Sequence, residues 1–235
     1  MNLRAKAISH PGNHRGHNED ACLDRADLGL WVVADGAGGH DAGEVASGRI
    51  VAALDAIPAG LGAPEMLAEV RDRIETVHRG LLVEAAQRGP RSMIASTAVI
   101  LCVRDTHYAC LWAGDSRCYL LRDGALEQVS HDHSLVQELV DAGAIAEDAA
   151  ESHPQANVIT RAVGGTEDMQ LDKITDRIQP GDRFLLCSDG ITKSIGEAAI
   201  AALLPGPDPA AALIDAALDS DARDNITVVV VDVAE

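Results

Sequence analysis

The chain has 235 residues, and 37 acidic against 19 basic side chains give it a formal net charge of −18 at pH 7. A chain this acidic, with no local cluster of basic residues, is poorly suited to bind nucleic acid or the anionic surface of a membrane. Hydrophobic residues make up 47 % of the sequence, which argues against a disordered chain and predicts a globular fold. No Pro- or Ser-rich linker divides the chain, so we expect a single domain over residues 1–235.

Apolar residues recur with two different periods along the chain. Short apolar runs predict strands at residues 28–34, 97–103, 108–113, 118–121, 126–129, 184–187 and 226–233. Spacing typical of helices marks residues 42–57, 64–88 and 134–142, and the segment after Pro209. Groups of strands with helices between them, without a regular β-α-β alternation, predict an α+β domain built in layers.

Two of these predictions concern the strands themselves. The four strands between residues 97 and 129 are expected to form an antiparallel meander, because the last two flank Asp123-Gly124, a strong hairpin signal. The last strand, 226–233, is rich in β-branched residues without interruption. Such a run indicates burial on both faces of the strand.

The cysteines and the N-terminus bear on the cellular compartment. The five cysteines are an odd number without a Cys-x-x-Cys pair. They are expected to be free thiols in a reducing compartment rather than a disulfide framework or a zinc site. The N-terminal residues lack the apolar stretch of a signal peptide, and no run reaches the ~18 apolar residues of a membrane span. These features predict a cytoplasmic protein.

Three aspartates stand at the ends of apolar strands. Asp35-Gly36 and Asp189-Gly190 each follow such a strand, and Asp224 lies just before the last one. An isolated Asp-Gly is usually only a turn, but if these strands are neighbours, three carboxylates meet at one rim. Two bare carboxylates ~4 to 5 Å apart repel by roughly 3 to 4 kcal/mol at an effective dielectric of about 20, so such a group needs protons or cations. Oxygen ligands select hard ions such as Mg²⁺, Mn²⁺ or Ca²⁺ over zinc, and Gly36 would let its backbone carbonyl approach such an ion.

Further acidic residues and one arginine are candidates for the same site. Glu19 and Asp20 follow Arg15 closely, and Asp132 lies between two histidines just before a predicted helix. Arg15 fits a fork for an anionic oxygen, although a surface salt bridge to Glu19 is an equally good interpretation. Taken alone, Glu19, Asp20 and Asp132 are more typical of a solvated surface than of a metal site.

Six motifs occur in order along the chain: Arg15-Gly-His-Asn-Glu19-Asp20, Val33-Ala-Asp35-Gly36-Ala-Gly-Gly-His40 with Gly43-Glu44-Val-Ala-Ser47, Gly114-Asp115-Ser116-Arg117, Asp132-His133-Ser134, Ser188-Asp189-Gly190 and Asp224-Asn225. The order and spacing of these motifs resemble those of the metal-dependent protein serine/threonine phosphatases (PPM family, type 2C) in their short bacterial form. The resemblance extends from about residue 4 to the C-terminus. The resemblance implies a central antiparallel β-sandwich flanked by helices on both sides, in α-β-β-α layers.

The resemblance also implies a set of metal ligands. Asp35, Asp189 and Asp224 would hold two Mn²⁺ or Mg²⁺ ions, with Asp35 bridging them and the Gly36 carbonyl on the second ion. Asp132 would join Asp189 at a third metal site. The cofactors are therefore expected to be two or three divalent ions.

Other residues receive roles around the ions from the same resemblance. Glu19 and Asp20 would act through metal-bound waters, and Arg15 would bind the substrate phosphate. Residues 134–158 would form a flap beside the site. Many eukaryotic members have a histidine directly after the metal-binding Asp-Gly pair, as a proposed general acid, and here that position is alanine. The candidates for the leaving-group acid are then His40 and a metal-bound water.

The implied activity is hydrolysis of phosphoserine and phosphothreonine by direct attack of a metal-bridging water, whose pKa two adjacent cations lower. Arg15 would stabilise the charge on the phosphoryl oxygens. No protein nucleophile is required, and Ser116, which lacks a Gly-x-Ser-x-Gly elbow, is expected only to stabilise a turn. Expected partners are phosphorylated proteins and a cognate bacterial Ser/Thr kinase with its substrates. The alternative is a catalytically weak or inactive phosphoprotein-binding regulator of the same fold.

Overall fold

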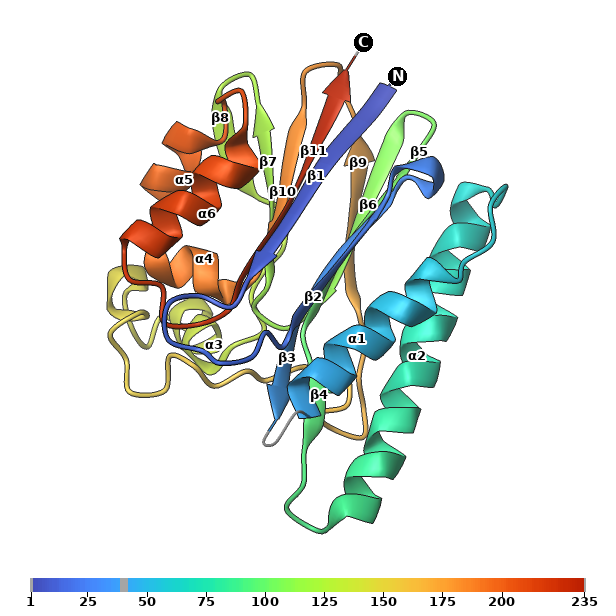
Figure 1. Ribbon diagram of the computed structural model, residues 1–235, viewed down its shortest axis with the longest axis vertical. Helices are drawn as coiled ribbons and strands as arrows, with labels where there is room; N and C mark the ends of the chain where they lie inside the picture. Colours follow the sequence, from blue (N-terminus) through green and yellow to red (C-terminus); the bar gives the residue numbers. More distant parts are fainter. Residues whose placement is uncertain (1, 39–41, 235) are drawn as a thin grey trace.

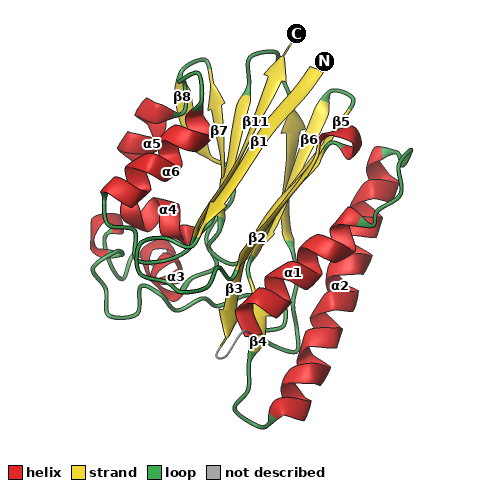
Figure 2. Ribbon diagram, in the orientation of Figure 1, coloured by secondary structure: helices red, strands yellow, loops and turns green. Residues whose placement is uncertain are grey.

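Two antiparallel β-sheets pack face to face, and helices cover the outer face of each (Figure 1, Figure 2). The computed structural model describes residues 2–38 and 42–234. The layers run helix, sheet, sheet, helix, so the predicted α+β sandwich is confirmed. The two ends of the chain lie side by side, because the first and last strands pair antiparallel from Asn2 opposite Ala234 to His10 opposite Ile226.

Each sheet takes its strands from distant parts of the sequence. The β11 sheet has the order β1-β11-β10-β7-β8, and the β3 sheet has the order β2-β3-β5-β6-β9 with β4 paired to β3 beside this path. The strands of the β11 sheet are β1 (Asn2–His10), β7 (Arg117–Arg122), β8 (Ala125–Gln128), β10 (Arg183–Cys187) and β11 (Ile226–Ala234). Those of the β3 sheet are β2 (Asp20–Arg25), β3 (Leu30–Gly38), β4 (Ile94–Ser96), β5 (Ala98–Arg104), β6 (His107–Ala113) and β9 (Asp172–Arg177).

The helices divide between the two outer faces. The β3 sheet is covered by α1 (Ala42–Asp55) and α2 (Ala63–Arg88), and the β11 sheet by α4 (Asp189–Ser194), α5 (Glu197–Leu203) and α6 (Pro209–Asp219). The connections contain α3 (Leu135–Asp141) and two 3₁₀ turns, η1 (Ala26–Leu28) and η2 (Glu147–Ala149). Local sequence sets the helix starts: the Glu65 carboxylate accepts a hydrogen bond from the Gly62 N–H at 2.7 Å, and the Ser134 hydroxyl accepts one from the Gln137 N–H at 3.3 Å.

The central strands contribute to two cores each, since successive side chains of a strand point to opposite faces. In β11, Val229 and Val231 pack between the two sheets, whereas Val228 and Val230 pack beneath the helices that cover the sheet. The prediction that the last strand is buried on both faces is therefore confirmed. Burial on both faces also explains why apolar residues run through this strand without alternation.

The predicted meander from residue 97 to 129 is wrong. β5 pairs with β6 and β7 pairs with β8, but β6 and β7 belong to different sheets. The chain leaves the β3 sheet at Gly114, where φ is 111° and an added Cβ would lie 2.6 Å from the Thr97 side chain. The hairpin at Asp123-Gly124 is confirmed, and both of its residues have positive φ, as the tight turn between β7 and β8 requires.

Sequence reasoning missed four strands: β1, β2 and β9, which stand at sheet edges, and the three-residue β4, which pairs with β3. Along β1 exposed and half-buried side chains alternate, and in β9 all six side chains are exposed. Edge strands bury less apolar surface than central ones, so their residues carry a weak hydrophobic pattern. One predicted strand also starts later than expected: residues 26–28 form a 3₁₀ turn, and β3 runs on past Asp35.

All five cysteines are free thiols, as predicted. Burial raises the pKa of Cys102 and of Cys187 to about 12, so both thiols stay protonated near neutral pH. Within residues 2–38 and 42–234, no helix combines the length and the apolar character that crossing a membrane requires.

The single phenylalanine offers a test of the packing between the sheets. Phe184 is fully buried, and its ring meets Tyr108 of the opposite sheet edge to face, with 4.9 Å between ring centroids. We expect Phe184→Ala to lower the free energy of unfolding by about 3 to 5 kcal/mol, measured by urea denaturation. The exposed Val83 is the matched control, and Val83→Ala should change stability by less than about 0.5 kcal/mol. Equal losses for the two variants would contradict the described core.

Candidate active site

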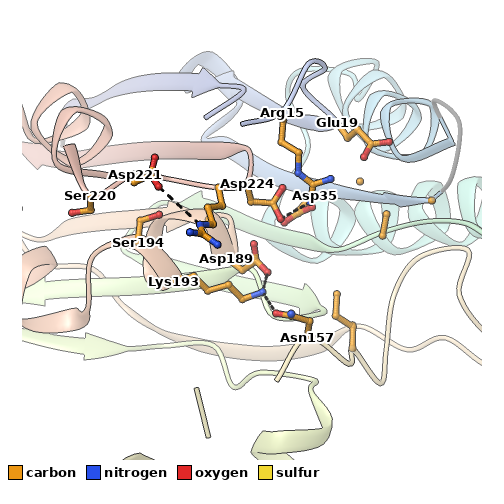
Figure 3. Close-up of a pocket in the computed structure, with 16 residues that line it drawn as sticks. Arg15, Glu19, Asp35, Asn157, Asp189, Lys193, Ser194, Ser220, Asp221 and Asp224 are labelled. Atoms are coloured by element: carbon orange, nitrogen blue, oxygen red, sulfur yellow. Dashed lines mark hydrogen bonds and ion pairs between the residues drawn. The ribbon is translucent and has the colours of Figure 1, made fainter. Parts of the chain in front are cut away.

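An acidic cavity of about 750 Å³ opens where the two sheets meet at one end of the sandwich (Figure 3). Asp35 and Gly36 reach it from β3, and Asp189 reaches it from the first turn of α4, directly after β10. Asp224 comes from the residues before β11, and Arg15 from the loop between β1 and β2. The structure thus brings together the three aspartates that the sequence placed at strand ends.

Asp35 has the strongest anionic surroundings of the group. Its pKa is raised well above the ordinary value, first by desolvation and then by the neighbouring charges of Asp189 and Asp20. Asp20 lies directly opposite Asp35 in the pairing of β2 with β3. The carboxylates are therefore close enough to repel one another, which is the condition under which a cation binds favourably.

Asp20, opposite Asp35 on the neighbouring strand, links the two sheets. Its Oδ2 accepts hydrogen bonds from the hydroxyls of Ser188 at 2.8 Å and Thr227 at 2.6 Å, both from the opposite sheet. Its Oδ1 is buried and has no hydrogen-bond donor. Burial, together with the charges of Asp189 and Asp224, raises the pKa of Asp20 to about 7, although the two hydroxyl donors lower it.

Two basic side chains contact the acidic group from opposite walls, as Figure 3 shows. An Arg15 guanidinium nitrogen lies 2.9 Å from Oδ2 of Asp224. Lys193, one turn along α4 from Asp189, contacts Oδ2 of that aspartate, while Oδ1 of Asp189 is buried without a donor. Arg15 therefore pairs with Asp224. The salt bridge to Glu19, which was one of the two interpretations of the sequence, is not formed.

Gly36 leaves no room for a side chain beside the cavity. A Cβ on this residue would lie 2.2 Å from the carbonyl oxygen of Gly43 and 2.6 Å from that of Glu19. Its N–H donates to the Glu19 carbonyl at 3.2 Å, which holds Glu19 against β3. Glu19 and Gly36 both line the cavity, so the close packing keeps backbone at this wall.

Asn225 organises the loop that carries Arg15, a role that sequence reasoning did not assign. Its side-chain oxygen accepts from the Glu19 N–H at 2.8 Å, and its amide nitrogen donates to the carbonyls of Pro11 and His17, each at 3.0 Å. One side chain therefore fastens both ends of the loop before β2. The signal was the Asp224-Asn225 pair, in which only the acid had been interpreted.

Asp132 is the site residue whose surroundings differ most from those expected. Its carboxylate is buried but does not line the cavity, and it accepts hydrogen bonds from the Arg117 guanidinium at 2.8 to 3.0 Å and from Gln128 at 3.0 Å.

Asp115 is also buried, and its Oδ1 has no hydrogen-bond donor. Burial raises the pKa of Asp115 to about 7, and among charged neighbours Asp189 acts on it most strongly. Asp115, in the Gly-Asp-Ser-Arg motif, is thus the acid that sequence reasoning missed beside Asp189.

The Ser116 hydroxyl is not placed to act as a nucleophile in this structure. Ser116 is buried, and its hydroxyl lies 2.7 Å from that of Thr97. Thr97 in turn accepts a hydrogen bond from the Asp35 N–H at 3.0 Å. Ser116 therefore supports the backbone that carries Asp35.

The expected flap, residues 134–158, contains α3, η2 and mostly exposed side chains. Its two ends are joined where the Leu135 N–H donates to the Val158 carbonyl at 2.9 Å. Asn157 of this segment lines the cavity and accepts a hydrogen bond from Lys193 at 2.7 Å. His40, the predicted side-chain candidate for the leaving-group acid, lies outside the described residues.

The donor set suits hard divalent cations. It consists of carboxylate and backbone oxygens, and buried oxygens of Asp20 and Asp189 lack a proton donor. Over the described ranges, no three His, Cys, Asp or Glu side chains stand in an arrangement that could already hold an ion. The basic partners account for this, since Arg15 draws Asp224 to one wall and Lys193 draws Asp189 to the other.

Comparison with known proteins identifies the family. A family model described as protein phosphatase 2C matches residues 13–206. The chain belongs to the protein phosphatase 2C family. The serine/threonine protein phosphatase PstP of Mycobacterium tuberculosis is 36 % identical over 236 residues, which cover 99 % of this chain and 45 % of that protein. The serine/threonine phosphatase stp of Listeria monocytogenes is 34 % identical over 241 residues, covering 98 % of this chain and 96 % of stp.

Solved structures of the phosphatase 2C family share the fold over nearly the whole chain. PppA, described as a key regulatory component of T6SS in Pseudomonas aeruginosa, gives a TM-score of 0.92 at 43 % identity, over 99 % of this chain and 98 % of that one. The catalytic domain of PstP in complex with two manganese ions gives 0.86 at 35 % identity, over 99 % of both chains. The chain thus spans less than half of full-length PstP and all but a few residues of its catalytic domain.

The raised pKa values predict how the metal-free phosphatase 2C domain responds to pH. Because the pKa of Asp20 rises from 3.8 to about 7 on folding, the folded state binds more protons than the unfolded state between these values. Stability is then lost as the pH rises through this window, so the Tm in EDTA should fall between pH 5 and pH 8. Mn²⁺ should offset the loss, because it binds the ionised carboxylates.

Asp20→Asn should flatten this pH dependence, measured by thermal denaturation in EDTA. The control is Asp24→Asn on the same strand, whose carboxylate accepts from the Trp31 side chain instead. An unchanged slope for Asp20→Asn, or an equal change for Asp24→Asn, would contradict the assignment.

Proposed function

We propose that this chain is a metal-dependent protein serine/threonine phosphatase that hydrolyses phosphoserine and phosphothreonine. The observation that carries the proposal is the convergence of Asp35, Asp189 and Asp224 on one cavity, with Asp20 paired opposite Asp35 and with buried oxygens of Asp20 and Asp189 that have no proton donor. Membership of the phosphatase 2C family and the two manganese ions in the PstP catalytic domain support it.

Two Mn²⁺ or Mg²⁺ ions would be held by Asp35, Asp189 and Asp224, with the Gly36 carbonyl as a further ligand. Bound there, such ions would lower the pKa of a coordinated water molecule. Their positive charge would also stabilise the phosphoryl oxygens. Glu19 and Asp20 would accept hydrogen bonds from the water around the ions. The hydroxyls of Ser188 and Thr227 keep Oδ2 of Asp20 occupied and leave Oδ1 for this task.

Arg15 would bind the phosphoryl group. Its side chain is half-exposed and lies on the cavity wall, and the charge of Asp224 raises its pKa further, so it stays charged. The planar guanidinium can donate two parallel hydrogen bonds to phosphoryl oxygens. Asn225 fixes the loop that carries Arg15, which limits the loss of side-chain entropy on binding.

A covalent protein intermediate has little support. No cysteine or histidine occurs among the described residues that line the cavity, and the Ser116 hydroxyl is buried against Thr97. The identity of the leaving-group acid stays a prediction, with His40 as the side-chain candidate. The inactive-regulator alternative is not favoured, since Asp35, Asp189 and Asp224, the acids expected to hold the first two ions, converge on the cavity.

Phosphorylated proteins are the proposed substrates, and a cognate bacterial Ser/Thr kinase with its own substrates is the proposed functional partner. The similarity to serine/threonine phosphatases of Mycobacterium tuberculosis and Listeria monocytogenes supports phosphorylated proteins as the substrates. A cytoplasmic setting is proposed as well, on the support of five free thiols.

The direct test is metal-dependent turnover. Hydrolysis of a phosphothreonine peptide and of p-nitrophenyl phosphate should require Mn²⁺ or Mg²⁺ and should stop in EDTA. Asp189→Asn should lower kcat/KM by at least about 100-fold, since a metal ligand is lost. The control is Asp208→Asn, an exposed carboxylate paired with Lys6. Hydrolysis that persists after both metals are removed would overturn the proposal, and phosphopeptide binding without turnover at saturating Mn²⁺ would favour the regulator.

Arg15→Ala should raise KM by roughly 10- to 100-fold, the loss expected for charged hydrogen bonds worth about 1.5 to 3 kcal/mol. Bound Mn²⁺ should not decrease, because Arg15 contacts Asp224 from the side of the cavity that the phosphate would take. Steady-state kinetics and metal analysis measure the two effects, with the exposed Arg79→Ala as the control. A loss of bound metal without a change in KM would show that Arg15 maintains the metal ligands instead.

A further inference from the structure

Lys193 is a basic side chain that lies among acidic residues. The two proposed ions do not engage every carboxylate oxygen of these residues. Lys193 lies four residues after Asp189 on α4, so the two side chains share one helix face, and its ammonium contacts Oδ2 of Asp189. The same ammonium donates to the Asn157 side chain at 2.7 Å. Figure 3 shows Lys193 extending from α4 between these two partners.

The second acid near this ammonium is Asp115. It is buried, it lacks a donor at Oδ1, and Asp189 and Lys193 are the two charged groups that act on it most strongly. Asp132, the other candidate for this place, is already neutralised by Arg117 through hydrogen bonds to both carboxylate oxygens. Lys193 is therefore in contact with one carboxylate of the Asp115–Asp189 pair, and its charge also acts on the other.

We infer that the Lys193 ammonium is a built-in cation at the third position of this centre, so that the protein binds two divalent ions where the Asp115–Asp189 pair could otherwise hold a third. The inference rests on the proposed function, because it presupposes that Asp35, Asp189 and Asp224 hold the first two ions. An ammonium neutralises one charge and leaves Asp189 with a free oxygen for those ions. It also excludes a third ion, because it occupies the Asp189 oxygen that such an ion would need and already neutralises one of the two carboxylates.

Lys193 has a second partner that anchors it at this place. Asn157 belongs to the segment beside the cavity, and no other side chain of that segment contacts α4 by a hydrogen bond among the described residues. Arg15 differs in this respect, because its contact in the cavity is Asp224 alone and its guanidinium is free to turn toward a phosphate. Lys193 is therefore a positioning residue that fixes Asp189 and the base of the segment at once.

The test counts bound ions. Mn²⁺ is titrated into the purified metal-free protein, and the free ion is measured by its electron paramagnetic resonance signal. Wild-type protein should bind two ions. Lys193→Asp, which replaces the ammonium by a ligand, should bind three, and Lys193→Gln should bind a third ion more weakly than Lys193→Asp. Lys6→Asp is the matched control, because it breaks another Lys–Asp contact at an exposed place far from the cavity, and it should still bind two.

The outcomes separate this inference from the proposed function. Three ions in wild-type protein would overturn the role of Lys193 and leave the phosphatase proposal standing. Two ions in both folded Lys193 variants, checked by circular dichroism, would overturn it as well. Failure of wild-type protein to bind any Mn²⁺ would contradict the proposed function itself. The wild-type count alone can overturn the inference where a variant does not fold.

Discussion

Electrostatic repulsion among buried carboxylates is the constraint on which the active end of this molecule depends. Asp20, Asp35, Asp115 and Asp189 have little water around them, and the pKa values of Asp20, Asp35 and Asp115 are raised by burial and then by the charge of Asp189. Left ionised and unpaired, such a group would oppose the packing of the two sheets. Protons, hydroxyl donors, two basic side chains and divalent ions are the means by which the protein can keep these residues together.

The sandwich determines where these means are placed. Asp20 and Asp35 come from the β3 sheet, whereas Asp189 and Asp224 flank β10 and β11 of the other sheet, so the site forms only when the sheets pack. The hydroxyls of Ser188 and Thr227 cross this boundary to reach Asp20. Asn225 fastens the loop of Arg15 across the same boundary. Binding of ions and packing of the sheets therefore stabilise each other.

Local patterns in the sequence predict part of the active site. Asp35, Asp189 and Asp224 stand beside strongly apolar strands, and the structure brings all three to one cavity as the strand pattern suggested. The roles of Asp115 and Lys193 depend on contacts between segments far apart in the chain, which no local pattern reveals. The same reason explains the wrong meander, because the apolar pattern of β6 and β7 does not say which sheet each joins. The missed edge strands show the converse, since their pairing is regular and their burial is slight.

The overall charge of −18 is a poor guide to the substrate of such a centre, because a phosphoprotein is also an anion. What an approaching phosphate meets is the field of the cavity, where ions on Asp35, together with Arg15 and Lys193, would outweigh the carboxylates. X-ray diffraction from Mn²⁺-soaked crystals at the manganese absorption edge tests this claim most directly. We expect two anomalous peaks that share Asp35 as a ligand, with the Lys193 ammonium still on Asp189. Peaks elsewhere in the molecule, or none at the cavity, would contradict it.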